Sequence, residues 1–109
     1  NWKRSLEVLR YSAEQGLLTK TGLMVGLGET SEEVISTMKQ AYNVGVTIFT
    51  IGQYLRPTKG HLEVKSYVSK DKFDYYKRIG LKIGFDVIES GPLVRSSYHA
   101  DEQARLVIR

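Results

Sequence analysis

Three short segments of the sequence combine side chains that could contact a ligand. In the first, Gly26-Leu-Gly-Glu-Thr30, two glycines and a carboxylate directly follow an apolar run. Glycine lets the backbone approach a ligand closely, and the amides at a helix start favour an anionic group. This is not a dinucleotide-binding fingerprint, because Ser31 occupies the position of its third glycine. A tight strand-to-helix turn explains the same residues equally well.

The other two segments are polar and aromatic. Gln53-Tyr-Leu-Arg-Pro57 could line a binding site, or it could form a capped loop with a solvated arginine. Arg95-Ser-Ser-Tyr-His99 gathers a guanidinium, two hydroxyls, a phenol and an imidazole. Ser97, His99 and Asp101 do not predict a catalytic triad, because the members of a triad are aimed from separate elements. A polar tail without chemistry of its own is the alternative interpretation of this cluster.

The composition limits the chemistry further. The chain has no cysteine, which excludes disulfides, thiolate zinc sites and iron–sulfur clusters held by its own thiols. Its two histidines, His61 and His99, are too few for a zinc site. The net charge of +4 is small for a dedicated nucleic-acid binder. The longest mostly apolar stretch, residues 45–52, is far shorter than the roughly 20 residues of a membrane-spanning helix. We therefore expect no nucleic-acid or membrane partner, and a cytoplasmic chain.

Helices and strands are expected to alternate along the chain. The first helix shows apolar residues at helical spacing and closes near Gly16. A second helix opens with the capping-box pair Thr30 and Glu33 and ends at Gly45, and Ser69 caps a third that ends at Gly84. The expected apolar stripes of these helices are, in turn, Leu6, Leu9, Ala13 and Leu17; Val34, Met38, Ala41 and Tyr42; and Phe73, Tyr76, Gly80 and Ile83. The expected strands are residues 21–28, 46–51 and 85–89.

This alternation predicts the α/β class with a parallel sheet, because each return crossover packs a helix on the sheet. Three strands make an unusually small parallel sheet, and 109 residues are fewer than the roughly 150 of a typical domain. We therefore expect residues 1–89 to be the second half of a larger α/β barrel or open sheet, and residues 90–109 to be a C-terminal tail. Ligands bind beyond the carboxyl ends of such strands, which is where the three segments lie. Residues 53–67, between the second strand and the third helix, form a loop long enough to bind or cover something.

Taken together, the segments closely resemble the lipoyl synthase family of radical S-adenosylmethionine enzymes. The resemblance is carried by Lys20-Thr-Gly-Leu-Met-Val-Gly-Leu-Gly-Glu29, Thr50-Ile-Gly-Gln-Tyr-Leu-Arg-Pro57 and Ser90-Gly-Pro-Leu-Val-Arg-Ser-Ser-Tyr-His-Ala100, in the family's order and spacing. It covers nearly the whole chain and raises the tail cluster from a polar tail to a functional segment. It implies the C-terminal half of a partial (β/α) barrel of the radical S-adenosylmethionine type.

The implied reaction inserts two sulfur atoms into an octanoyl group on a lysine of a lipoyl carrier domain. The implied cofactors are S-adenosylmethionine and two 4Fe-4S clusters. By this resemblance, the residues that bind S-adenosylmethionine are Gly22, Met24, Gly26, Glu29, Gln53, Tyr54 and Leu55. Ser97 matches the family's oxygen ligand to the auxiliary cluster.

The cysteine motifs that the family needs lie N-terminal to the matched region. We therefore expect no cluster and no catalysis from this chain alone, and we expect the N-terminal half of the enzyme as a partner. For a eukaryotic source the compartment would be the mitochondrion or a plastid. One alternative is a non-catalytic fragment or pseudoenzyme that binds a partner such as a lipoyl carrier domain. Another is a generic nucleotide-binding α/β module, which the missing third glycine disfavours.

Overall fold

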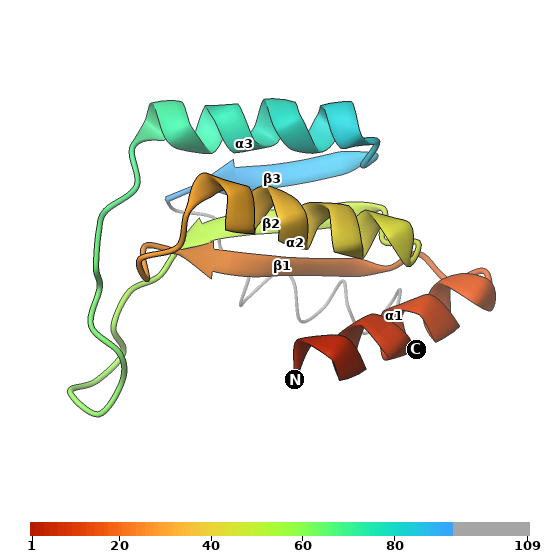
Figure 1. Cartoon of the computed structure of the whole chain (residues 1–109), viewed down its shortest axis with the longest axis horizontal. Coiled ribbons are helices and arrows are strands. Elements are labelled where there is room, and N and C mark those ends of the chain that lie inside the picture. The colour runs from red at the N-terminus through yellow and green to blue at the C-terminus, as the bar shows by residue number, and fades with distance from the viewer. Residues whose placement is uncertain (93–109) are drawn as a thin grey trace.

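The computed structural model describes residues 1–92 of the chain, in which three helices alternate with three strands. The order is α1 (Trp2–Glu14), β1 (Lys20–Val25), α2 (Ser31–Asn43), β2 (Ile48–Gln53), α3 (Lys70–Ile83) and β3 (Val87–Gly91) (Figure 1). The predicted alternation is therefore confirmed. Ser97 and the rest of the Arg95–His99 segment lie outside the described residues.

The three strands form one parallel sheet in the order β1-β2-β3. Gly22 of β1 lies opposite Thr50 of β2, and Thr50 lies opposite Glu89 of β3. Consecutive strands are thus neighbours, and each pair is joined by a helical crossover, α2 or α3. The α/β class with parallel strands is confirmed, and an open sheet built this way is consistent with part of a (β/α) barrel.

Side-chain and glycine caps fix the ends of the helices. The Thr30 hydroxyl accepts from the Glu33 amide at 3.1 Å and the Glu33 carboxylate accepts from the Thr30 amide at 2.8 Å, so the predicted capping box is present. At the other end of α2, the Val46 amide donates to the Ala41 carbonyl around Gly45, whose φ is 104°. This is the Schellman arrangement, which needs a residue with positive φ.

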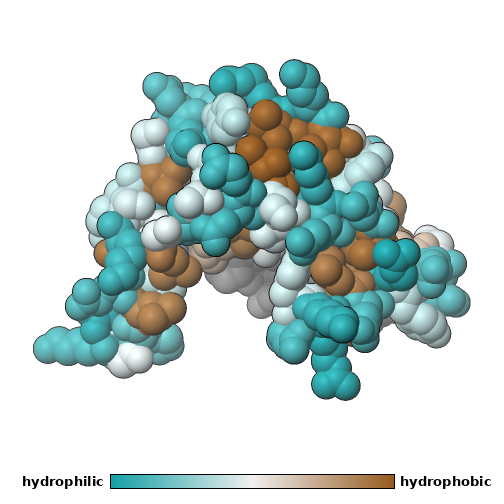
Figure 2. Space-filling model, in the orientation of Figure 1, coloured by the Kyte–Doolittle hydropathy of each residue, from teal (hydrophilic) through white to brown (hydrophobic). Residues whose placement is uncertain are grey.

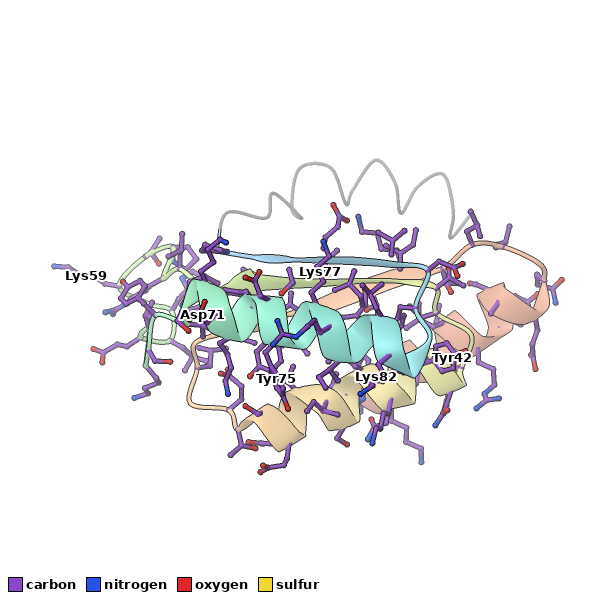
Figure 3. All side chains as sticks on the ribbon, turned by 90° about the horizontal axis from the view of Figure 1, so that it is seen from above. Tyr42, Lys59, Asp71, Tyr75, Lys77 and Lys82 are labelled. Atoms are coloured by element: carbon purple, nitrogen blue, oxygen red, sulfur yellow. The ribbon has the colours of Figure 1, made fainter. Side chains whose placement is uncertain are left out.

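The core lies between the sheet and α2 and α3, which cover the same face (Figure 3). Met38 of α2 and Gly80 of α3 come together there over Ile88 of β3. Phe49 and Ile51 of the central strand are completely buried against these helices. Much of the predicted stripe pattern is confirmed, since Val34, Met38, Ala41, Phe73, Tyr76 and Gly80 are all buried. Tyr42 is an exception: it is 41% exposed, although its ring packs edge-on against Phe85.

The strand boundaries differ from those predicted. The first strand spans residues 20–25 rather than 21–28, because Gly26 and Gly28 adopt positive φ and turn the chain away. The other two strands begin two residues later than predicted, at Ile48 and Val87. Val46 and Phe85 misled the prediction, because both are buried and apolar but belong to the connections that follow the helices. Gln53 ends β2, so the long loop that follows begins at residue 54.

Replacement of Gly45 by alanine should destabilise the fold. Its φ of 104° is costly for any residue with a Cβ, and the new methyl group would lie 2.5 Å from the Ala13 Cβ, where α1 approaches α2. We expect the free energy of unfolding of Gly45→Ala to fall by about 2 kcal/mol, measured by urea denaturation of the complete protein. Gly60→Ala is the matched control, because a Cβ there meets nothing closer than 3.9 Å. Equal stability of the two variants would contradict this account of the α1–α2 junction.

Candidate cofactor site

No helix among residues 1–92 covers the second face of the sheet (Figure 3). Strand alternation and register place three rows of side chains on this bare face. From the amino to the carboxyl ends of the strands, the rows are Lys20, Ile48 and Val87; Gly22, Thr50 and Glu89; and Met24, Gly52 and Gly91. The carboxyl-end row is the least bulky, since two of its three members are glycines.

Gly22 and Met24, two of the predicted site residues, share this face. A Cβ on Gly22 would collide with the hydroxyl and carbonyl oxygens of Thr50, so only glycine lets β1 and the Thr50 side chain lie this close. Met24 leaves 42% of its surface exposed beside Gly52. The structure thus presents an exposed apolar thioether two residues along β1 from the exposed backbone of Gly22, a surface on which a flat ring can pack.

An ion pair crosses the bare face nearer the amino ends of the strands than Met24. The Lys20 ammonium lies 3.1 Å from the Glu89 carboxylate, so β1 and β3 are linked across the central strand. The Lys20 side chain is only 4% exposed, whereas that of Glu89 is 43% exposed. Removal of Glu89 would take an opposite charge away from this buried ammonium, which is unfavourable. The pair therefore fixes the three strands relative to one another on the side where Gly22 and Met24 lie.

The turn between β1 and α2 is closed by the Glu29 carboxylate. Its oxygens accept from the Gly26 amide at 3.0 and 3.1 Å and from the Leu27 amide at 3.0 Å. Gly26 has a φ of 104°, and a Cβ there would lie 2.6 Å from the Ser66 carbonyl. Gly26 and Glu29 therefore shape the turn at the carboxyl end of β1, and Glu29 directs its charge at the backbone of its own turn.

Gln53 holds the loop that follows β2. Its amide nitrogen donates to the carbonyls of Tyr54 at 3.0 Å and Ser66 at 2.9 Å, and its oxygen accepts from the Val68 amide at 2.8 Å. The side chain is buried and all of these bonds are made to backbone. The structure thus places Gln53 beneath the loop, not on the bare face with Met24.

Tyr54 and Leu55, the other predicted contacts, lie at the start of the same loop. The Tyr54 phenol donates to the Leu62 carbonyl at 2.6 Å, while its backbone amide donates to the Val25 carbonyl at 2.8 Å. Leu55 is exposed. The structure therefore groups the predicted residues into two sets: Gly22 and Met24 on the sheet face, and the others around the carboxyl ends of β1 and β2.

The described residues do not fit an iron–sulfur cluster. The chain has no cysteine, and nowhere in residues 1–92 do three histidine, aspartate or glutamate side chains come together. A nucleoside cofactor fits better, because Gly22 and Met24 are both exposed on the bare face near the carboxyl end of β1. What this part of the chain can do chemically is bind and orient such a group.

Sequence reasoning missed three residues of the bare face: Lys20, Thr50 and Glu89. Charged residues in strands are usually expected on a solvated surface, so neither Lys20 nor Glu89 was singled out. The sequence did carry a signal for Lys20: it lies two residues before Gly22, so strand alternation places both residues on the same face.

The fold defines this chain as part of an α/β protein with a parallel sheet, one face of which is covered by no helix of residues 1–92. Comparison with curated proteins identifies the particular relatives. The chain is 59% identical over 102 residues to lipoyl synthase of Rubrobacter xylanophilus, covering 92% of this chain and 32% of the relative. It is 55% identical to the apicoplast lipoyl synthase of Plasmodium yoelii yoelii, covering 94% of this chain and 21% of that protein. It is 53% identical to the mitochondrial lipoyl synthase of Nematostella vectensis, covering 93% and 35%.

These similarities confirm the predicted resemblance: the chain is similar to the C-terminal portion of lipoyl synthases. The chain spans about a third of the length of most of the curated relatives it matches. No protein-family model matches it. Among residues 1–92, no helix has the length and apolar character needed to cross a membrane.

Gln53→Ala should release the loop after β2. The substitution removes the two hydrogen bonds that the Gln53 side chain donates to carbonyls and the one that it accepts from the Val68 amide. We therefore expect the loop to lose about 2–3 kcal/mol of local stability. We expect hydrogen exchange of residues 62–68 to accelerate by at least ten-fold in the complete protein. Gln15→Ala, at an exposed helix end, is the matched control. Unchanged exchange in Gln53→Ala would show that the loop is held by other contacts.

Proposed function

We propose that this chain forms the S-adenosylmethionine-binding side of a lipoyl synthase. The observation that carries the proposal is the bare face at the carboxyl ends of the strands, where Met24 is exposed beside Gly22 and Gly52. Strand carboxyl ends are where ligands bind in parallel α/β architectures. The resemblance to lipoyl synthases supports S-adenosylmethionine as the ligand.

In this proposal the residues act in two groups. Met24 packs against the nucleoside, and Gly22 lets the backbone approach it, while the buried Gly26 forms the turn beside them. Glu29, Gln53 and Tyr54 support the binding surface by holding the turn and loop that border it, since their polar groups bond mainly to backbone. Leu55 lies on the exposed rim. Bound S-adenosylmethionine supplies the radical chemistry that activates the substrate.

The complete enzyme, on this proposal, inserts two sulfur atoms into the octanoyl group of a lipoyl carrier domain, and residues outside this chain hold its two 4Fe-4S clusters. Residues 1–89 would provide the second half of the barrel. Residues 90–109 would provide the tail, with Ser97 as the oxygen ligand of the auxiliary cluster. The compartment would be the cytoplasm in a bacterium, or the mitochondrion or plastid in a eukaryote. Nothing favours the alternative of a pseudoenzyme that only binds a partner.

Met24→Ala should weaken S-adenosylmethionine binding in the complete protein. The truncation removes the apolar surface that would cover the ring, and burial of that much surface is worth about 1–2 kcal/mol. We expect the Kd from isothermal calorimetry to rise about ten-fold. Val87→Ala is the matched control, because Val87 is 43% exposed on the same face but lies at the amino end of its strand. If both variants weakened binding equally, or if neither did, the proposed placement of the nucleoside beside Met24 would be contradicted.

Residues 1–109 alone should bind no iron–sulfur cluster and catalyse no sulfur insertion. The physical reason is the lack of thiolates, since a serine alone cannot hold a cluster. After identical reconstitution with iron and sulfide, we expect the complete protein to carry two clusters and the isolated chain none. Iron and sulfide assays with absorbance spectra measure this. Stoichiometric cluster in the isolated chain would be incompatible with the proposal.

A further inference from the structure

The connection between β2 and α3 extends well beyond the proposed cofactor site, which uses only its first two residues, Tyr54 and Leu55. It comprises residues 54–69, which we call the β2–α3 loop. The loop extends past the carboxyl ends of the strands, at the left of Figure 1. Connections longer than roughly 12–15 residues without secondary structure are uncommon and are usually functional or disordered. The β2–α3 loop therefore calls for an explanation.

Hydrogen bonds hold the loop in a defined shape. Gln53 binds its base, and the Gly26 carbonyl accepts from the amides of Lys65 at 2.7 Å and Ser66 at 3.2 Å. Near the tip, the Arg56 guanidinium donates to the carbonyls of Thr58, at 3.0 Å, and Lys59. A preformed loop loses little conformational entropy when a partner binds, so the shape of the loop suits recognition.

The surface of this loop is apolar and basic. Leu55, Leu62 and Tyr67 are 57%, 70% and 76% exposed, and brown patches interrupt the hydrophilic arm at the lower left of Figure 2. Three basic side chains, those of Arg56, Lys59 and Lys65, outnumber the one acidic side chain, that of Glu63. Glu63 lies 3.6 Å from Arg56, whereas Lys59 points outward at the end of the molecule in Figure 3. Exposed aromatic and apolar groups flanked by one sign of charge are typical of a protein-binding surface.

We propose that the β2–α3 loop docks an acidic surface of the protein substrate beside the site where the substrate's modified lysine enters. This inference rests on the proposed function, because it assumes that the substrate group arrives on a protein. Charge complementarity identifies the occupant: the loop carries a net charge of +2 and lies on a chain with an isoelectric point of about 9.4. The apolar side chains of Leu62 and Tyr67 would supply the buried contacts at the centre of the interface.

The test compares two substrates in the complete enzyme: an octanoylated carrier domain with acidic residues around its lysine, and a short neutral octanoyl-lysine peptide. The variant Lys59→Glu/Leu62→Ala changes exposed side chains and leaves the Leu62 carbonyl to accept from Tyr54. We expect its KM for the carrier domain to rise about five-fold or more at low salt, with kcat unchanged. The effect should shrink at high salt, and the peptide's KM should not change.

The matched control is Lys82→Glu/Leu81→Ala, which makes the same changes on exposed residues in the last turn of α3, far from Lys59 in Figure 3. An equal loss in the control would mean that only overall charge matters, and the docking proposal would fail. It would also fail if both variants matched the wild type, if the peptide's KM rose as much as the carrier's, or if a carrier with neutralised acidic residues bound equally well. Tyr67→Ala, which changes no charge, repeats the test if the double variant has a lowered melting temperature.

Failure of the proposed function has a different signature. A wild-type enzyme that bound no S-adenosylmethionine and modified neither substrate would overturn the function itself. Fluorescence anisotropy of the labelled carrier domain would still report on docking in that case. A carrier affinity about five-fold weaker for the loop variant than for the α3 variant supports the interface, and equal affinities overturn it.

Discussion

The handedness of two helical crossovers determines where everything else in this structure lies. A crossover between parallel strands is right-handed, and here both crossovers step in the same direction, from β1 to β2 and from β2 to β3. The helices α2 and α3 must therefore cover the same face. Strand alternation then buries Phe49 and Ile51 against them and directs Thr50 to the other face, beside Gly22. A sheet face that α2 and α3 leave uncovered is thus a consequence of the topology.

Hydrogen bonds at the carboxyl ends of the strands hold the segments that border the proposed site. Glu29 and Gln53 are polar residues in the motifs that indicate cofactor binding, yet both direct their hydrogen-bonding groups to nearby backbone. Their contribution is to hold a glycine turn and a long loop in place. In the proposed site, direct contact with the ligand falls to the exposed Gly22 and Met24. The residues of one motif therefore serve different purposes, which their order in the sequence does not reveal.

Local signals in the sequence were sufficient for the helices and for the fold class. The capping pair Thr30 and Glu33 and the closing Gly45 act within one or two turns, so their geometry follows from spacing. The predicted strand limits were less accurate, because an apolar residue such as Phe85 indicates that the position is buried, not that it pairs with a neighbouring strand. The Lys20–Glu89 ion pair was missed, since it depends on the register of three strands that are distant in sequence. The predicted role of Ser97 remains a prediction.

The bare face and the sheet edges also indicate how the rest of a lipoyl synthase would complete this chain. Among residues 1–92, β1 and β3 each have one side without a paired strand, and Met24 lies on the face that no helix covers. Unpaired strand edges are prone to pair with further strands. The relatives are about three times as long as the matched region, which leaves ample sequence to supply cysteines and further strands. The Lys20–Glu89 pair would then lie in the interior of the completed structure, where a charge is tolerated only with a partner, and this gives a physical reason for linking β1 to β3 on that face.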